Sequence, residues 1–256
     1  MQTLTQNGVT LLKSHIIAAP HGFSTRHGGV STQPHLASLN LGFNCGDNPA
    51  NVAENYRRLA TAAGVSEGII RASQIHSARV ATVDEEFLAA YDNASPPECD
   101  GFVTALTGVT LSVRTADCVP VLAHDPKTGV ISAFHAGWRG AVGGILAAGV
   151  SAMEELGADV ADICVAIGPC IAPCCFEVGE DFISAYTNAL GSGYAQRFIT
   201  NSHADLPATC VALLEETGVL STNIDLAGEC TCCNQDKFFS HRGSGGKRGL
   251  LAAVIG

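Results

Sequence analysis

Two apolar runs separated by a short polar turn occupy residues 115–140, TADCVPVLAHDPKTGVISAFHAGWRG. The runs at 121–123 and 130–134 are mostly aliphatic or β-branched, and residues 124–129 between them are mostly of turn-forming types. Two strands with so short a connection lie antiparallel, so the pattern predicts a β-hairpin. This hairpin brings Cys118, at the head of the first run, beside His135, at the end of the second.

A thiol and an imidazole side by side suit two kinds of site. Together they are metal ligands, because zinc prefers sulfur and nitrogen donors. They are equally a nucleophile and its general base. The hairpin residues alone leave both interpretations open.

Strands and helices are both predicted outside the hairpin. Apolar residues recur at helical spacing over 51–63, with Asn48 or Asn51 as N-cap and Gly64 at the end. Further helices are expected over residues 140–156, 180–190 and 206–216. Strands are expected over residues 74–83, 101–104, 110–115, 163–167, 223–226 and 250–255, and from 238 into a basic loop. We therefore expect an α+β fold in which mixed β-sheets are layered with flanking helices.

Composition narrows the class of protein. The chain has 256 residues, of which 46% are hydrophobic, and this is enough for a sizeable core. A formal charge of −10 argues against nucleic acid and anionic membranes as partners, because both attract basic surfaces. No apolar run approaches the roughly 18 residues of a membrane span, and the N-terminus lacks a secretion signal. We expect a cytoplasmic protein.

Eleven cysteines, an odd number, favour free thiols over a disulfide framework. They include two clusters, one at 170, 174 and 175 and the other at 230, 232 and 233. Neither cluster contains the paired C-x-x-C motifs of zinc ribbons. We therefore expect most of these cysteines to be small buried apolar residues and do not predict a second metal site.

Three other places carry polar residues of interest. His76, on a predicted strand, is by itself more typical of a structural histidine than of a ligand. Arg26 precedes the Gly28-Gly29 pair in a loop that suits an anion, although a plain surface loop is the simpler interpretation. The most cationic loop in this acidic chain contains Arg242 and Arg248.

A series of motifs in order along nearly the whole chain resembles the multicopper polyphenol oxidoreductase (laccase-like) domain family. Members of this family are also described as purine nucleoside phosphorylases and as peptidoglycan editing factors. The most specific motifs are Ala116-Asp117-Cys118-x-Pro120 and His135-Ala136-Gly137-Trp138-Arg139-Gly140. The others are Ser24-Thr25-Arg26-x-Gly28-Gly29-Val30-Ser31, Leu39-Asn40-Leu41-Gly42, Cys45-Gly46-Asp47-Asn48, Gln74-x-His76, Asp100-Gly101, Gly168-Pro169, Phe176-Glu177-Val178-Gly179 and Phe239-Ser240-x-Arg242.

The resemblance implies one zinc-type site made by His76, Cys118 and His135, in a pocket at strand ends and loops of a single domain spanning residues 1–256. Two imidazoles and a thiolate suit a catalytic zinc ion with an open fourth position, and copper can occupy the same ligands. The implied substrates are phosphate and a purine nucleoside: adenosine, inosine or S-methyl-5'-thioadenosine. Adenosine deamination is implied as well. Expected contacts to substrate or phosphate come from Arg26, Asn40, Arg242 and Arg248.

Some positions depart from the usual family pattern, and these are Tyr56, Ser77, His241 and residues 246–248. The three expected ligands are unchanged, so the departures bear on substrate contacts. Three alternatives to the phosphorylase stay open: a copper polyphenol oxidase, a Cys118-dependent hydrolase of peptidoglycan precursors, and a metal-storage protein. Nine histidines without a His-x-His pair disfavour the multicopper cluster of a true laccase.

Overall fold

Two six-stranded β-sheets form the centre of the computed structural model, which describes residues 1–256. In spatial order the first sheet contains β1 Gln2–Gln6, β2 Val9–Lys13, β3 His21–Ser24, β14 Leu251–Ile255, β7 Thr110–Thr115 and β4 Ile69–Ile70. The second contains β13 Ile224–Leu226, β10 Cys164–Ile167, β8 Val119–His124, β9 Ile131–Ala136, β6 Gly101–Thr104 and β5 Val80–Thr82. Each sheet has parallel and antiparallel pairs, so the predicted α+β fold with mixed sheets is confirmed.

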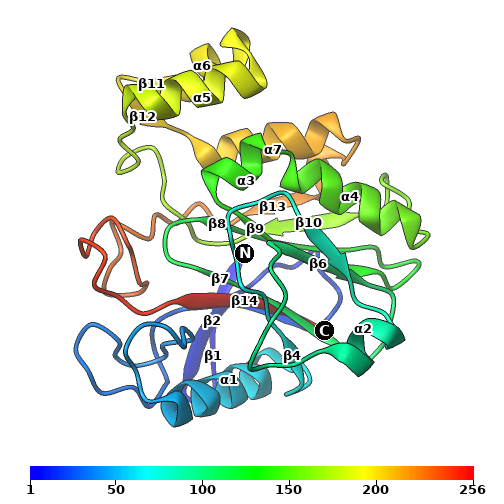
Figure 1. Ribbon diagram of the computed structural model, residues 1–256, viewed down its shortest axis with the longest axis vertical. Coiled ribbons are helices and arrows are strands. Elements are labelled where there is room, and N and C mark those ends of the chain that lie inside the picture. The colour runs from blue at the N-terminus through cyan, green and yellow to red at the C-terminus, as the bar shows by residue number, and fades with distance from the viewer.

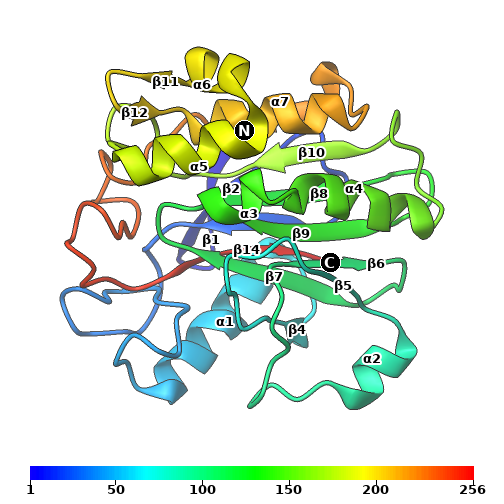
Figure 2. The same ribbon diagram turned by 45° about the horizontal axis from the view of Figure 1, so that its top comes forward.

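Seven helices flank the sheets. They are α1 Pro49–Ala63, α2 Glu85–Ala90, α3 Trp138–Val142, α4 Ile145–Glu155, α5 Glu180–Leu190, α6 Ser192–Phe198 and α7 Leu206–Glu216. Helix α1 lies on the side of the first sheet, whereas α3, α4 and α7 lie on the side of the second (Figures 1 and 2). Helices α5 and α6, with the small hairpin of β11 Ile199–Thr200 and β12 His203–Ala204, form the outermost part beyond them. None of the helices combines the length and the apolarity needed to cross a membrane.

The apolar core has three layers that follow this arrangement. One layer lies between the two sheets, where Leu111 and Ala253 of the first sheet meet Leu122 and Ala133 of the second. A second layer packs α1 on the first sheet, and a third packs α4 and α7 on the second. Each sheet is therefore covered on both faces, which explains why β8, β9 and β14 are buried along their whole length.

The predicted hairpin is confirmed. Strands β8 and β9 are antiparallel, with Pro120 opposite His135, and Cys118 immediately precedes β8. The helix predicted over 51–63 is also confirmed as α1. Asn48 caps it by accepting a hydrogen bond from the Ala50 amide, and Gly64 ends it in the left-handed region with a φ of 80°.

Three predicted elements were wrong in whole or in part. Only β5 is a strand within residues 74–83, because the backbone turns at His76, where φ is 60°. The helix predicted over 140–156 is two helices, α3 and α4, separated at Gly144 with a φ of 92°. No strand begins at Phe238, since residues 241–246 form consecutive turns.

Gly149 allows α4 to lie close to the second sheet. A Cβ atom at this position would lie 2.4 Å from Cζ of Phe134 in β9. We expect Gly149→Ala to lower the free energy of unfolding by about 1–2 kcal/mol, because overpacking outweighs the gain in helix propensity. Urea titration measures this. Gly193→Ala in α6 is the control, because a Cβ atom added at this position would meet no other side chain or strand within 4 Å, and the substitution should be neutral or slightly stabilising. Equal stability of the two variants would contradict the prediction.

Candidate metal centre

The three expected ligands converge in space. His76 lies in the turn before β5, Cys118 in the turn between β7 and β8, and His135 near the end of β9. Their ligand atoms all lie within 4.8 Å of one another, and His76 Nε2 is 3.9 Å from Cys118 Sγ. Nitrogen and sulfur ligands on one tetrahedral zinc ion are about 3.5 Å apart, from bond lengths of about 2.0 and 2.3 Å. The donor set and its spacing therefore fit a single zinc-type ion.

Asp100 organises two of these donors. Its carboxylate is fully buried and accepts a hydrogen bond from His135 Nδ1 at 2.8 Å, which leaves Nε2 of that ring free to bind a metal. It also accepts hydrogen bonds from the backbone amides of Ile75, His76 and Ser77, at 3.2, 3.0 and 2.6 Å. These bonds hold the turn that carries His76. Asp100 belongs to the Asp100-Gly101 motif, but the sequence predicted no role for it in the site.

Two of the donors lie where the chain passes between the sheets. His76 is on the connection from β4 in the first sheet to β5 in the second, and Cys118 is on the connection from β7 to β8. Only His135 belongs to a strand. The centre is therefore assembled from two inter-sheet connections and one strand.

Asp117 and Gly137 support the turn of Cys118. Asp117 adopts a φ of 90°, and its carboxylate accepts hydrogen bonds from Thr231 Oγ1 at 2.7 Å and from the backbone amide of Arg242 at 2.6 Å. A Cβ atom on Gly137 would lie 2.7 Å from His76 Cδ2 and 3.3 Å from Cys118 Sγ. Glycine at this position allows the two donors to approach each other.

Burial and hydrogen bonding act in opposite directions on the titrating groups of the centre. Burial raises the pKa of the Cys118 thiol, but hydrogen bonds and charge from His135 and His76 outweigh it and lower that pKa to about 6. Burial lowers the pKa of His135, but Asp100 and Cys118 outweigh it and raise that pKa to about 9. Hydrogen bonds from His135 and Ser77 likewise outweigh burial at Asp100 and hold its pKa well below the usual range. Without a metal, Cys118 and His135 thus form a thiolate–imidazolium pair near neutral pH.

We expect Cys118 to be unusually reactive once metal has been removed. A thiol with a pKa of about 6 is roughly 90% thiolate at pH 7, against a few per cent for an ordinary thiol with a pKa of about 8.5. In chelator-treated protein, alkylation of Cys118 by iodoacetamide should therefore persist down to about pH 6. Peptide mass spectrometry reads the rate at each pH, and added zinc should protect the thiol. Alkylation that falls off below about pH 8, as for an ordinary thiol, would contradict this assignment.

The centre lies in a pocket of about 530 Å³ that is lined by all three donors. Cationic side chains also line it, namely Arg114, Arg242 and Arg248. None of these arginines forms an ion pair with a carboxylate. The pocket therefore keeps positive charge in a protein whose formal net charge is −10.

The structure brings two of the four predicted substrate contacts to this pocket. Arg242 and Arg248 line it, and the buried Nε of Arg248 has no hydrogen-bond partner. Arg26 lies outside the lining; its guanidinium lies over the Phe239 ring and donates to three backbone carbonyls. Asn40 is also outside, fully buried, and is bonded to Gly42 and neighbouring groups.

Arg114 is a pocket residue that we did not predict. It lies near the end of β7, where Gln74 holds its backbone through hydrogen bonds to both its amide and its carbonyl, each at 2.8 Å. One signal was available, since Gln74 belongs to the Gln-x-His motif. Nothing in the sequence, however, indicated that the side chain of Gln74 forms hydrogen bonds with a strand residue 40 positions further along the chain.

Fold and site together define a class: an α+β protein with a candidate metal centre that opens into a cationic pocket. Residues 20–256 match a family model described as multi-copper polyphenol oxidoreductase laccase. The chain belongs to this family, as its motifs had indicated. The term multi-copper comes from the description of the family. In this chain the site itself contains one group of possible metal ligands, two histidines and one cysteine.

Relatives and solved structures agree with the family assignment. A purine nucleoside phosphorylase from Deinococcus radiodurans is 40% identical, over 99% of this chain and 95% of that protein. The adenosine deaminase RL5 from an unknown prokaryotic organism is 37% identical, over 86% and 87% of the two chains. The crystal structure of YlmD from Geobacillus stearothermophilus superimposes with a TM-score of 0.85 at 32% identity, covering 99% of this chain and 97% of that one. The hypothetical protein YfiH from Bacillus licheniformis gives a TM-score of 0.88 at 29% identity, covering 98% and 97%.

Proposed function

We propose that this chain is a zinc-dependent purine nucleoside phosphorylase that acts on adenosine, inosine and S-methyl-5'-thioadenosine and also deaminates adenosine. One observation carries the proposal: the His76, Cys118 and His135 donor set opens into the same pocket as three arginines without carboxylate partners. Phosphorolysis needs an anion held beside the nucleoside and stabilisation of the charge that develops as the bond breaks. The names of the relatives at 37–40% identity support the same chemistry.

The arginines serve the phosphate in this proposal. An oxygen of phosphate forms a bond to C1′ of the ribose while the bond from C1′ to the purine nitrogen breaks, and the purine leaves with the electron pair and takes up a proton. Arg248 is best suited to hold phosphate, because Nε lacks a partner and Nη1 contacts only Cys45 Sγ at 3.9 Å. Arg242 has backbone acceptors for both terminal nitrogens and supplies charge more than free donors.

The donor set serves the purine side of the pocket. When bound, zinc supplies a Lewis acid and lowers the pKa of a coordinated water toward about 7, as deamination requires. Asp100 keeps His135 in the tautomer that presents Nε2, and it fixes the turn that carries His76. A pocket of about 530 Å³ lies in the range that encloses small ligands such as nucleosides. Copper is the alternative ion, because imidazole and thiolate bind it tightly.

The test is turnover of inosine with and without phosphate. Zinc-loaded, reduced protein should release hypoxanthine and ribose 1-phosphate only when phosphate is present, and chromatography separates both from inosine. With adenosine, adenine should form with phosphate, and inosine should form without it. Hypoxanthine release that is independent of phosphate, or no turnover of any of the three nucleosides, would overturn the proposal.

Arg248 provides a sharper test of the phosphate site. We expect Arg248→Ala to raise the KM for phosphate by about tenfold or more, since a charge-assisted contact to an anion is worth about 1.5–3 kcal/mol. The KM for inosine should change much less. Lys247→Ala, at the neighbouring position outside the pocket lining, is the matched control and should leave both constants unchanged. Equal effects of the two substitutions on the KM for phosphate would count against a phosphate site at Arg248.

The Cys118–His135 pair also favours a second candidate, a hydrolase in which Cys118 attacks an amide of a peptidoglycan precursor and His135 acts as its base. Metal removal separates the two functions. A phosphorylase loses its activity when zinc is removed, whereas a cysteine hydrolase retains its activity without zinc and loses it when Cys118 is alkylated.

We further propose that the protein acts in the cytoplasm. All eleven cysteines are free thiols, and a reducing compartment keeps thiols in this state.

A further inference from the structure

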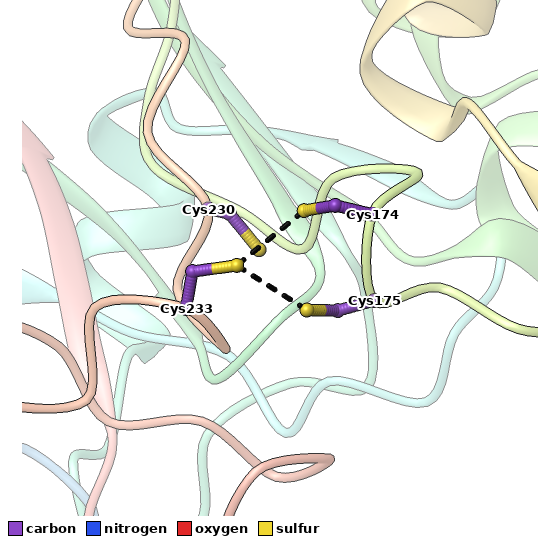
Figure 3. A group of neighbouring side chains, drawn as sticks. All are labelled: Cys174, Cys175, Cys230 and Cys233. Carbon is purple, nitrogen blue, oxygen red and sulfur yellow. Dashed lines mark hydrogen bonds between the residues drawn. The ribbon is translucent and has the colours of Figure 1, made fainter.

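We propose a second metal site in this protein, in which Cys174, Cys175, Cys230 and Cys233 bind one zinc ion through four thiolates. Their sulfur atoms all lie within 4.8 Å of one another (Figure 3). None of the four belongs to the centre at Cys118 or lines its pocket. The proposed ion would have a structural role, separate from the proposed reaction.

The spacing of the sulfur atoms suits a common ion. A zinc–sulfur bond of about 2.3 Å places the sulfurs of a tetrahedral site about 3.8 Å apart. Cys233 Sγ lies 3.5 Å from Cys174 Sγ and 3.4 Å from Cys175 Sγ. These separations exceed the roughly 2.05 Å of a disulfide bond, and the four residues are free thiols.

Packing does not account for this cluster. We expected most of the cysteines to be small buried apolar residues, but Cys174 and Cys233 are exposed. Soft donors gathered at a surface, two from each of two loops, are typical of a closed zinc site. Cys230-Thr231-Cys232-Cys233 also contains one C-x-x-C unit, which delivers two sulfurs to one ion.

Backbone contacts hold the two loops in register. The Cys170 amide donates to the Glu229 carbonyl at 3.3 Å, and the Thr231 amide donates to the Cys170 carbonyl at 3.0 Å. The Ala172 amide points at Cys230 Sγ, 3.4 Å away. Amide hydrogen bonds of this kind satisfy a thiolate that also binds a metal. The four donors are therefore positioned by the fold, although 58 or 59 residues separate Cys233 from its two neighbours.

Zinc suits the site because four soft sulfur donors in a tetrahedral arrangement leave no open position for a substrate. The ion would clamp the loop after β10 to the loop after β13. This clamp matters for the pocket, since Phe176 follows directly after Cys175 and is part of the pocket lining. Arg242 reinforces the same wall by donating to the carbonyls of Cys175 and Glu177, at 3.0 and 2.9 Å.

Metal content tests the proposal without reference to catalysis. Protein purified under reducing conditions, loaded with zinc and desalted should contain two zinc ions per chain. Cys233→Ser should lose one of the two, and Cys118→Ala should lose the other. Cys232→Ser is the matched control, because Cys232 lies in the same loop but outside the group of four, and it should keep both ions.

Either of two results would overturn the second site: zinc in the wild-type chain that is lost entirely in Cys118→Ala, or a zinc content in Cys233→Ser equal to that of the wild type. A Cys174–Cys233 disulfide, found by mass spectrometry in protein kept under reductant, would overturn it as well. If Cys233→Ser does not fold, cobalt-loaded Cys118→Ala decides the question. One cobalt ion with the intense absorption of four thiolate ligands supports the site, and the absence of bound cobalt contradicts it.

Discussion

Replacing Cys118 or His135 with alanine is expected to lower kcat/KM for phosphorolysis of inosine by about 10³-fold or more. Each substitution removes one of the three donors of the proposed zinc site, and a catalytic metal typically supplies several kcal/mol of transition-state stabilisation. The two losses should not add in the double variant, because removal of either donor disables the same unit. Initial rates of hypoxanthine release and the metal content of each variant measure the effect.

Two controls separate loss of the centre from general damage. Cys164→Ala in β10 and His203→Ala in β12 replace residues of the same types away from the pocket lining, and both should retain activity. Circular dichroism verifies that each variant is folded. Full activity in Cys118→Ala or His135→Ala would show that the reaction does not depend on this centre.

Asp100→Ala is expected to lower both the stability of the protein and its affinity for metal. The substitution leaves His135 and the amides of the His76 turn without their buried acceptor, which should cost about 3–5 kcal/mol of unfolding free energy. Zinc affinity should fall by about 10–100-fold or more, as for other outer partners of ligating histidines. Urea titration and competition with a chelator measure the two effects.

Asp100→Asn distinguishes the role of the charge from that of the side-chain volume. Its amide fills the same space but presents NH₂ toward groups that donate, so zinc affinity should still fall while stability falls less. Asp236→Ala, at an exposed position, should change neither quantity. Wild-type stability and wild-type zinc affinity in Asp100→Ala would refute the organising role of this carboxylate.

The same carboxylate makes stability depend on pH. The pKa of Asp100 in the folded protein lies below the value of about 3.9 in an unfolded chain. Its contribution is therefore fully present above about pH 5 and is lost as the pH falls through the acidic range. The difference in stability between wild type and Asp100→Asn should shrink accordingly.

Local patterns were enough to predict most of the elements. Helix α1, helix α7 and the β8–β9 hairpin depend on caps, turn residues and periodicity, all of which act over a few residues. The turn at His76 could not be predicted in this way. The conformation of its backbone is fixed by hydrogen bonds to a carboxylate 24 residues further along the chain. The alternation of polar and apolar residues, from which a strand was predicted, does not reflect that contact.

The candidate site shows the same limit. Placing His76 with Cys118 and His135 depended on the family resemblance, because no local motif spans the 42 residues between the first two donors. Arg114 could not be predicted as a pocket residue, because the sequence pattern of a strand does not reveal that a pocket lies at the end of the strand. The four cysteines of the proposed second metal site belong to two loops, and each loop taken alone supplies only two of the four donors.

The position of His76 and Cys118 on connections between the two sheets has a consequence for the order of folding. The donors meet only after both connections are closed and the sheets have docked, because β4 and β7 belong to one sheet and β5 and β8 to the other. Bringing His76 to Cys118 closes a loop of 42 residues, and this entropic cost precedes any gain from binding. Capture of the ion is then a late event: zinc added during refolding should slow later unfolding without accelerating collapse of the chain.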